Sequence, residues 1–249
     1  MEVITSQKNS VVRLFRSLSD KKGRRESGLF PVEGGNSVRD IPGDFPLKFV
    51  LATPERSGEA EEILRARGNG TELYLVSESV MSSLSDTVTP YGLAAAAVIP
   101  EREFALPAGK AVLLDGVSDP GNLGTILRTA AATGFGEVYL LGCTDAYAPK
   151  CVRASMGGIF RVRVTEVTPQ RATELVRATN SVALDMNGAP LSCSRSDDIL
   201  FVAGSEAHGV SREIALSAKE VRSLPMSGGV ESLNVAVACA VAMYSTILS

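Results

Sequence analysis

Three segments in the second half of the chain combine glycine with short polar side chains. They are residues 115–128 (DGVSDPGNLGTILR), 204–210 (GSEAHGV) and 224–234 (LPMSGGVESLN), and each follows a short apolar run. Ligands bind in open α/β sheets where the strands end, and glycine lets a backbone approach a ligand closely. Any one of these segments taken alone is most simply a turn. Three of them in one domain favour a small-molecule site.

The glycine spacing disfavours the common nucleotide-binding loops. Gly116, Gly121 and Gly124 fit neither G-x-G-x-x-G nor G-x-x-x-x-G-K-[ST], which nicotinamide dinucleotide and nucleoside triphosphate sites require. A metal site is also disfavoured, because the four cysteines are widely and irregularly spaced and His208 is the one histidine. His208 has no constellation of cysteines or carboxylates around it in the sequence, so we expect a loop residue rather than a catalytic base. We therefore expect no metal ion.

Several polar and basic residues supply directional donors for a nucleic acid. Asn122 and Arg128 lie near the start of one predicted helix, where an amide and a guanidinium can bind a phosphate or a ribose oxygen. Lys150 and Arg153 lie beside a second predicted helix start. Residues 1–25 hold seven basic side chains against two acidic ones. Contact with RNA and simple exposure to solvent both remain open for these cations.

Two α/β units are expected to position these residues. The first unit, residues 1–100, contains apolar runs typical of short strands at 29–32, 49–52, 73–76 and 93–99 and of helices at 11–18 and 59–67. Residues 21–28 are expected to be a polar break. Residues 101–109 carry proline and glycine with little pattern, and we predict a linker there.

The second unit, residues 110–249, has a different hydrophobic pattern from the first. Short apolar runs alternate with helical stretches, which predicts a mostly parallel sheet with helices on its faces. The runs are 111–114, 137–141, 181–184, 200–203 and 221–224. The last predicted helix, 232–247, is apolar almost all round and is expected to be buried.

The bulk composition is ordinary for a globular protein. Of the 249 residues 45% are hydrophobic and 21% are charged, and the formal net charge is −3, so no global basic field indicates nucleic acid. The cysteine spacing disfavours a disulfide framework and fits a reducing cytosol. An apolar signal core is lacking at the N-terminus, and residues 235–248 are too short to cross a bilayer comfortably. We expect a cytoplasmic protein without a membrane partner.

The order of three segments resembles a known family. DGVSDPGNLGTILRTAAATGF (115–135), APKCVRASMGGIFRV (148–162) and FVAGSEAHGV (201–210) with LPMSGGVESLNVAVA (224–238) are similar to the three motifs of SpoU/TrmH proteins, the RNA 2′-O-ribose methyltransferases of the SPOUT superfamily. Residues 4–35 and 86–97 more weakly resemble the family's ribosomal-protein-like substrate-binding domain. The resemblance implies a C-terminal SPOUT domain with a parallel sheet and a deep trefoil knot, which periodicity does not reveal.

The resemblance also implies roles for individual residues. Methyl transfer would involve Asn122, Arg128, Ser232 and Asn234. S-adenosyl-L-methionine would be bound by Leu184, Gly204, Ser205, Glu206, Gly209, Leu224, Met226, Ser232 and Leu233. RNA, with ribosomal RNA favoured over transfer RNA, would be bound by Lys21, Lys22, Arg24, Arg25, Lys150 and Arg153. A homodimer through the C-terminal domain is implied as well, with Arg153 near its interface.

Three departures from the family pattern stand out. Gly204-Ser205-Glu206 replaces the frequent Gly-Asn-Glu, and the shorter serine puts one contact of the cofactor loop in question. Ala236 ends a Ser-Leu-Asn-Val-Ala run where relatives often carry serine, which is a mild change. GNSVRDIPGDF follows Glu33-Gly34 where relatives carry a longer helix, and this shortening bears on RNA selection more than on catalysis.

The chemistry follows from what methyl transfer demands. A ribose hydroxyl is a poor nucleophile, so a positive charge that stabilises its developing negative charge should accelerate the step. Arg128 is predicted to supply that charge, since arginine side chains stay protonated near neutral pH and make poor general bases. Asn122 would orient the ribose, and Ser232 and Asn234 would hold the shape of the site. Two other interpretations remain open at this point: an RNA-binding or ribosome-assembly factor with a decayed site, and a nucleotide-binding enzyme.

Overall fold

The computed structural model describes residues 2–68, 70–85, 89–191, 197–205, 207–227 and 232–248. The chain forms two compact units. The first contains Met1–Pro100 and Tyr147–Arg153, and the second contains Glu101–Ala146 and Ala154–Ser249. Among the described residues, no helix has the length and apolar character that crossing a membrane requires.

The first unit is built on a five-stranded mixed sheet in the order β1-β4-β3-β5-β2. Its strands are β1 (Val3–Ile4), β2 (Leu29–Glu33), β3 (Leu47–Ala52), β4 (Glu72–Val76) and β5 (Leu93–Val98). The alanine-rich β5 lies antiparallel between β3 and β2 and is buried along most of its length. Its small side chains leave room for larger neighbours such as Phe15, Phe49 and Leu51 in the same core.

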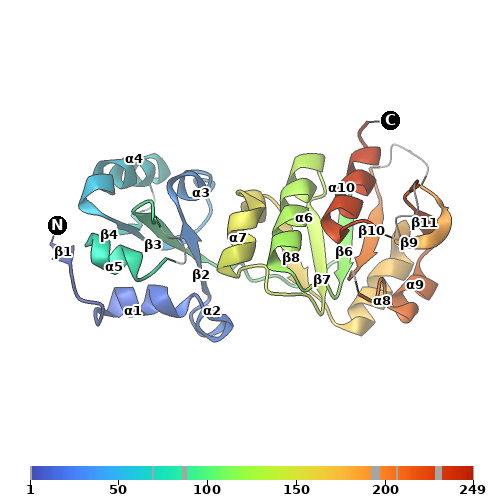
Figure 1. The fold of residues 1–249 in the computed structure, drawn as a ribbon, viewed down its shortest axis with the longest axis horizontal. Helices are drawn as coiled ribbons and strands as arrows, with labels where there is room; N and C mark the ends of the chain where they lie inside the picture. Colours follow the sequence, from blue (N-terminus) through green and yellow to red (C-terminus); the bar gives the residue numbers. More distant parts are fainter. Residues whose placement is uncertain are drawn as a thin grey trace. The chain divides into compact units, whose positions relative to one another are not determined.

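Within the described part of this unit, six helical segments accompany the sheet (Figure 1). They are α1 (Ser10–Ser17), α2 (Lys21–Ser27), α3 (Gly35–Arg39), η1 (Pro54–Arg56), α4 (Ser57–Arg67) and α5 (Glu78–Ser82). Asn9 caps α1 by accepting a hydrogen bond from the backbone N–H of Val11, and α1 buries Val12 and Phe15.

Helix α2 corrects the predicted polar break at 21–28. The guanidinium of Arg24 donates to the backbone carbonyls of Leu18 at 2.7 Å and Ser19 at 2.9 Å, and the residue is only 3% exposed. This buried arginine therefore ties α2 to the end of α1 through carbonyls five and six positions away, contacts that composition does not reveal. Gly28, with φ +66°, ends the helix in the left-handed region.

The second unit contains a six-stranded parallel sheet in the order β11-β9-β10-β6-β7-β8. Its strands are β6 (Ala111–Asp115), β7 (Glu137–Leu141), β8 (Arg163–Glu166), β9 (Ser181–Pro190), β10 (Leu200–Gly204) and β11 (Glu220–Ser223). The chain adds β7 and β8 on one side of β6 and β10, β9 and β11 on the other. Such a reversal of strand order opens a crevice at the carboxyl ends of the strands. The predicted parallel sheet is confirmed; β8 was not predicted.

Helices cover both faces of this sheet (Figure 1). They are α6 (Pro120–Thr133), η2 (Gly158–Phe160), α8 (Pro169–Ala178), α9 (Arg212–Ser217) and α10 (Val235–Ser245). Helix α7 (Pro149–Ser155) belongs largely to the first unit. Residues of α8 and α9 pack on β6 and β10 in one core, and α6 and α10 lie together on the other face. Because Tyr147 packs its ring on Phe30 at 4.9 Å, the start of α7 clusters with the first unit.

The apolar sequence of α10 predicted a helix buried on all sides, but one face of α10 is exposed. Val235, Ala236, Cys239, Ala242 and Met243 face the interior. Val237 and Val241 remain 48% and 47% exposed, and Tyr244 is 39% exposed. The sequence could not separate the two faces of α10, because both are apolar.

Candidate active site

The first glycine-rich segment forms the turn between β6 and α6. Gly116 has a φ of +73°, which a glycine adopts without strain. Asp119 caps α6 by accepting a hydrogen bond from the backbone N–H of Asn122 at 2.8 Å, and Pro120 occupies the first helical position. These local preferences place Asn122 in the first turn of the helix.

The third segment meets this helix through one amide pair. Asn234 caps α10, and its Oδ1 accepts from the backbone N–H groups of Ala236 at 2.9 Å and Val237 at 3.4 Å. Its Nδ2 donates to Oδ1 of Asn122 at 3.1 Å. Asn234 thus uses both ends of its amide, one for the helix and one for Asn122. Two predicted catalytic residues that are 112 positions apart lie in direct contact.

The loop after β10 is closed by hydrogen bonds between its own residues. Ser205 and Gly209 form a β-bridge, in which the N–H of Gly209 donates to the carbonyl of Ser205 at 2.8 Å. The Oγ of Ser205 accepts from the backbone N–H of His208 at 3.3 Å, so the serine holds the loop from within. A Cβ on Gly204 would lie 1.9 Å from the carbonyl carbon of Gly209. Glycine is therefore the residue that this packing admits at 204.

A cavity of about 420 Å³ opens beside this loop. That volume is within the range of small-ligand sites. Its lining contains eight of the nine residues predicted to bind the cofactor: Leu184, Gly204, Ser205, Gly209, Leu224, Met226, Ser232 and Leu233. The ninth, Glu206, lies outside the described residues. The lining also contains Val235 and Ala238 of α10.

A large irregularity in β9 builds one wall of the cavity, and sequence reasoning missed it. Val221 of β11 pairs opposite Ala183, but the next residue pairs opposite Ala189, so residues 184–188 bulge out. Within the bulge, Oδ1 of Asp185 accepts from the backbone N–H of Asn187 at 2.8 Å and from its Nδ2 at 3.1 Å. The Asp-x-Asn-Gly spacing is a turn signal that could have indicated this bulge.

The bulge and its neighbours add polar groups to the cavity that were not predicted. They are Asp185, Asn187, His208 and Arg222. Arg222 pairs with Glu220 at 2.7 Å, and its backbone lies 2.7 Å from where a Cβ on Gly188 would stand. A glycine at 188 lets β9 and β11 approach here.

Arg128 lies apart from the cavity lining. Its side chain is exposed, and within the described part of the chain it makes no hydrogen bond or ion pair. Its backbone is held by η2, since a Cβ on Gly158 would stand 2.7 Å from Cα of Arg128. Arg128 lies six positions after Asn122, about 9 Å along the helix axis. The structure thus brings Asn122 and Asn234 together and leaves Arg128 on the open surface of α6.

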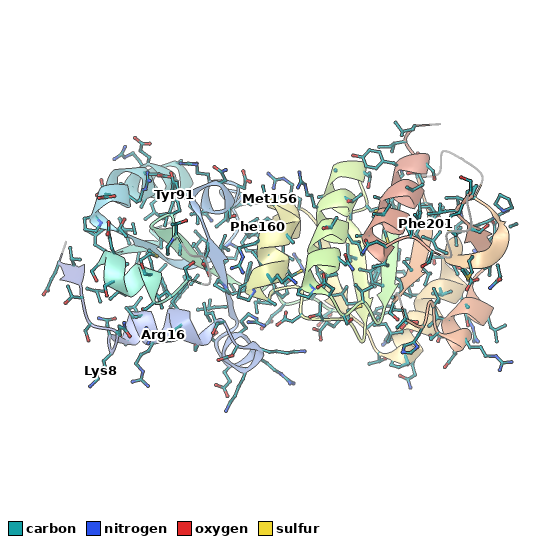
Figure 2. All side chains as sticks on the ribbon, viewed as in Figure 1. Lys8, Arg16, Tyr91, Met156, Phe160 and Phe201 are labelled. Atoms are coloured by element: carbon teal, nitrogen blue, oxygen red, sulfur yellow. The ribbon has the colours of Figure 1, made fainter. Side chains whose placement is uncertain are left out.

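The cations predicted to bind RNA differ in their surroundings. Lys21, Lys22 and Arg25 are exposed on α2, and Lys8 and Arg16 project beside α1 in the same unit (Figure 2). Arg24 is the exception, because its guanidinium is buried against the end of α1 and is not presented to a ligand. We therefore withdraw Arg24 from the predicted RNA contacts.

The two cations of the second motif lie on α7. Lys150 is exposed, and Arg153 is half-buried and forms an ion pair with Glu33 at 3.8 Å. Their contact with RNA phosphates stays a prediction.

Two further observations concern possible nucleophiles and metal ligands. Burial raises the pKa of the Cys143 thiol to about 11, so this residue close to Asp115 is a protonated thiol near neutral pH and a poor nucleophile. Its Sγ donates to the carbonyl of Leu114 at 3.2 Å. Among the described residues, no three side chains of histidine, cysteine, aspartate or glutamate gather as metal ligands would.

Two family models match this chain. Residues 109–244 match the model of the SpoU rRNA Methylase family, and residues 9–95 match that of the MRM3-like substrate binding domain. The Bacillus subtilis protein named 23S rRNA (guanosine(2553)-2′-O)-methyltransferase RlmP is 33% identical over 98% of both chains.

Two solved structures share the architecture over nearly the whole length. An AdoMet-bound rRNA methyltransferase from Sinorhizobium meliloti has a TM-score of 0.85 and 26% identity, with 100% of this chain and 99% of the other covered. The SpoU methyltransferase AviRb of Streptomyces viridochromogenes, in complex with AdoMet, has a TM-score of 0.85 and 25% identity, with 96% and 97% covered.

Proposed function

The chain belongs to the SpoU rRNA methylase family, and from that premise we propose that it transfers a methyl group from S-adenosylmethionine to a ribose 2′-hydroxyl of ribosomal RNA. The named activity of the Bacillus subtilis relative, which is similar over its full length, supports ribosomal RNA as the substrate. The observation that carries the proposal is the meeting of Asn122 and Asn234 beside a cavity lined by the residues of the third motif.

The cavity fits the cofactor in size and in chemistry. Leu184, Leu224, Met226 and Leu233 supply apolar walls suited to an adenine ring, and the loop at Gly204 supplies backbone groups without side-chain bulk. Ser205, the departure from the family pattern, retains a hydrogen bond that shapes this loop. We therefore propose that the serine preserves cofactor binding.

The mechanism divides the work among the chain's own residues. When bound, S-adenosylmethionine would supply an electrophilic methyl group on a sulfonium centre and would leave as the neutral thioether S-adenosylhomocysteine. Asn122, held by Asn234, orients the ribose so that its 2′-oxygen can attack in line. Arg128 stabilises the negative charge that develops on that oxygen, and its exposed position on α6 leaves it accessible to RNA. The hydroxyl proton passes to water or to a phosphate oxygen.

The proposal assigns the two units different tasks. Residues 1–100 bind the RNA, 101–109 link the units, and 110–249 carry the methyltransferase site. The match of residues 9–95 to a substrate-binding domain supports the first assignment. Lys21, Lys22, Arg25, Lys150 and Arg153 are the proposed phosphate contacts. The cytosolic location expected from the cysteine pattern and the deep trefoil knot expected from the family stay predictions.

A homodimer through the C-terminal unit is part of the same proposal. The exposed apolar residues Val237, Val241, Tyr244 and Leu248 recur at helical spacing along α10 and just beyond its end. Such a row is costly in water and suits a second copy of the chain. Val241→Asp is expected to convert a dimer to a monomer in light scattering, whereas a wild-type monomer would contradict the proposal.

Labelled S-adenosylmethionine and purified ribosomal RNA test the proposed reaction. Wild-type protein should place label in ribose 2′-O-methyl groups. Arg128→Ala should lose most of this activity and keep cofactor affinity, measured by calorimetric titration, because Arg128 does not line the cavity. Absence of cofactor binding in the wild-type protein would instead favour a ribosome-assembly factor with a decayed site. Near-normal turnover by the variant would remove Arg128 from the mechanism.

A further inference from the structure

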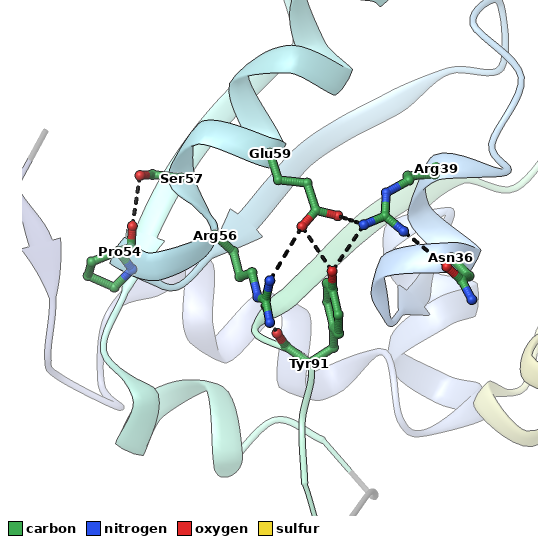
Figure 3. Close-up of polar contacts among 7 residues, drawn as sticks. All are labelled: Asn36, Arg39, Pro54, Arg56, Ser57, Glu59 and Tyr91. Atoms are coloured by element: carbon green, nitrogen blue, oxygen red, sulfur yellow. Dashed lines mark hydrogen bonds and ion pairs between the residues drawn. The ribbon is translucent and has the colours of Figure 1, made fainter.

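A compact network of charged and aromatic side chains lies on the first unit, and its central residue Tyr91 lines a cavity that Arg153 also lines. We call Asn36, Arg39, Arg56, Glu59 and Tyr91 the Tyr91 cluster (Figure 3). Its members come from α3, η1, α4 and the segment before β5. Tyr91 is the centre, because its hydroxyl accepts from Arg39 at 3.0 Å and donates to Glu59 at 3.0 Å.

Other residues of the first unit already pack against the ring of Tyr91. The guanidinium carbon of Arg56 stands 4.2 Å from the ring centroid and that of Arg39 stands 5.8 Å from it. A Cβ on Gly35 would lie only 2.3 Å from Cε1 of the ring. The ring therefore serves to hold two guanidiniums close together rather than to stack on a ligand.

The charges of the cluster do not balance. Glu59 pairs with Arg39 at 2.5 Å and with Arg56 at 3.9 Å, so two cations share one carboxylate. Exposed pairs in the second unit, such as Arg171 with Glu174, match one cation with one anion. Two like charges on one ring repel each other, and an added anion would relieve that repulsion.

Both guanidiniums retain donors that the described residues do not use. Each guanidinium carries five N–H donors. Arg39 donates to Asn36 and Tyr91 and pairs with Glu59, whereas Arg56 donates only through Nε, to the carbonyl of Tyr91 at 3.2 Å. The two side chains are 46% and 39% exposed. Their remaining N–H groups are therefore available from solvent.

We propose that the Tyr91 cluster binds a phosphate of the RNA backbone through Arg39 and Arg56. The proposal rests on the proposed function, because RNA is the substrate there. Guanidinium forks match the oxygens of a phosphate, and phosphate contacts of this kind fix the register of a protein on RNA. Glu59 has two effects: it holds both arginines in place, and its charge opposes the incoming anion.

The test uses the full-length protein and binding rather than methylation. The probes are an in vitro transcript of the 23S rRNA segment around the guanosine equivalent to that named for the Bacillus subtilis relative, and a structured RNA of equal length without it. The Arg39→Gln/Arg56→Gln double variant should bind both RNAs about tenfold more weakly, and its salt slope should fall by about 1. Lys48→Gln/Arg65→Gln removes two exposed positive charges elsewhere on the first unit; it is the charge-matched control and should change affinity less than twofold.

Glu59→Gln separates RNA binding from a purely structural role. The amide is isosteric and can still accept from Tyr91, so loss of its charge should leave affinity unchanged or improve it. If Glu59→Gln binds RNA as weakly as the double variant and has a lower melting temperature than the wild type, the cluster stabilises the fold and does not bind RNA. Unchanged affinity and salt slope in the double variant would overturn the proposal, and so would a wild-type protein that binds neither RNA.

Methylation, measured in parallel, distinguishes failure of the inference from failure of the proposed function. A wild-type protein that methylates the transcript, with a double variant that binds normally, refutes the Tyr91 cluster alone. A wild-type protein that binds RNA without methylating it, with a double variant that binds weakly, refutes the proposed reaction and supports the cluster.

Discussion

Asn234 allows the two tasks of one amide to be separated by mutation. Asn234→Asp keeps an oxygen that can cap α10, and aspartate is as good a cap as asparagine. The variant loses the Nδ2 donor and sets a carboxylate against Oδ1 of Asn122, at the place of a 3.1 Å hydrogen bond. Asn234→Ala, in contrast, loses both the cap and the bond.

The expected magnitudes follow from these contacts. Loss of the cap should cost about 0.5–2 kcal/mol, and a chain of this size melts about 2–4 °C lower per kcal/mol. Asn234→Ala should therefore melt a few degrees below the wild type, and Asn234→Asp within about 2 °C of it. A hydrogen bond is worth about 0.5–1.5 kcal/mol, and 1.4 kcal/mol corresponds to tenfold in rate. Both variants should therefore lose between about twofold and about thirteenfold in kcat.

Calorimetry and single-turnover methylation of ribosomal RNA measure the two effects independently. The diagnostic pattern is an Asn234→Asp protein that is stable but slow. Full kcat in Asn234→Asp would refute the claim that Asn234 positions Asn122. An equal loss of stability in both variants would refute the separation of capping from positioning.

Three further predictions test other parts of the structure. Gly204→Ala should abolish cofactor binding in calorimetry, because the added methyl group would lie 1.9 Å from the loop backbone, whereas Gly136→Ala, with open space around it, should bind normally. Arg24→Ala should lower the melting temperature by about 6 °C or more, because it removes two charged hydrogen bonds worth about 1.5–3 kcal/mol each, while Arg25→Ala should not; equal melting temperatures would contradict the structural role of Arg24. Burial raises the pKa of Tyr139 to about 12 from about 10 in an unfolded chain, so the stability it contributes is present below pH 10 and is lost as the pH rises towards 12. The stability gap between wild type and Tyr139→Phe in urea should therefore shrink above pH 10, and a constant gap would contradict this.

Five of the six strands in the sheet of the second unit could be predicted, because a short apolar run followed by a turn signal marks each of them; β8, which is short and largely polar, was not predicted. The same runs located the loops that line the cavity, since the ends of parallel strands share one edge. Leu184, Gly204 and Leu233 line one cavity as a set, although their contact with a cofactor stays a prediction. No spacing rule shows that Asn122 meets Asn234, because that contact depends on how α10 returns to α6.

Three features escaped prediction for physical reasons. Helix α2 is held to the end of α1 by Arg24. The buried guanidinium is stabilised by hydrogen bonds to the carbonyls of Leu18 and Ser19, and the residue pattern does not indicate these bonds. The bulge at 184–188 interrupts the pairing of β9 with β11, and the alternation of side chains in a strand does not signal an interruption of that length. The Tyr91 cluster joins four segments that are separated in the sequence.

The central claim is that the chain methylates ribose in ribosomal RNA, and a map of 2′-O-methyl groups tests it most directly. Ribosomal and transfer RNA would be compared between cells that have the protein and cells that lack it. The account predicts that one ribosomal position loses its methyl group in the deficient cells and regains it with the wild-type chain but not with Arg128→Ala. Identical maps in the two cell lines, or a lost methyl group in transfer RNA alone, would contradict it.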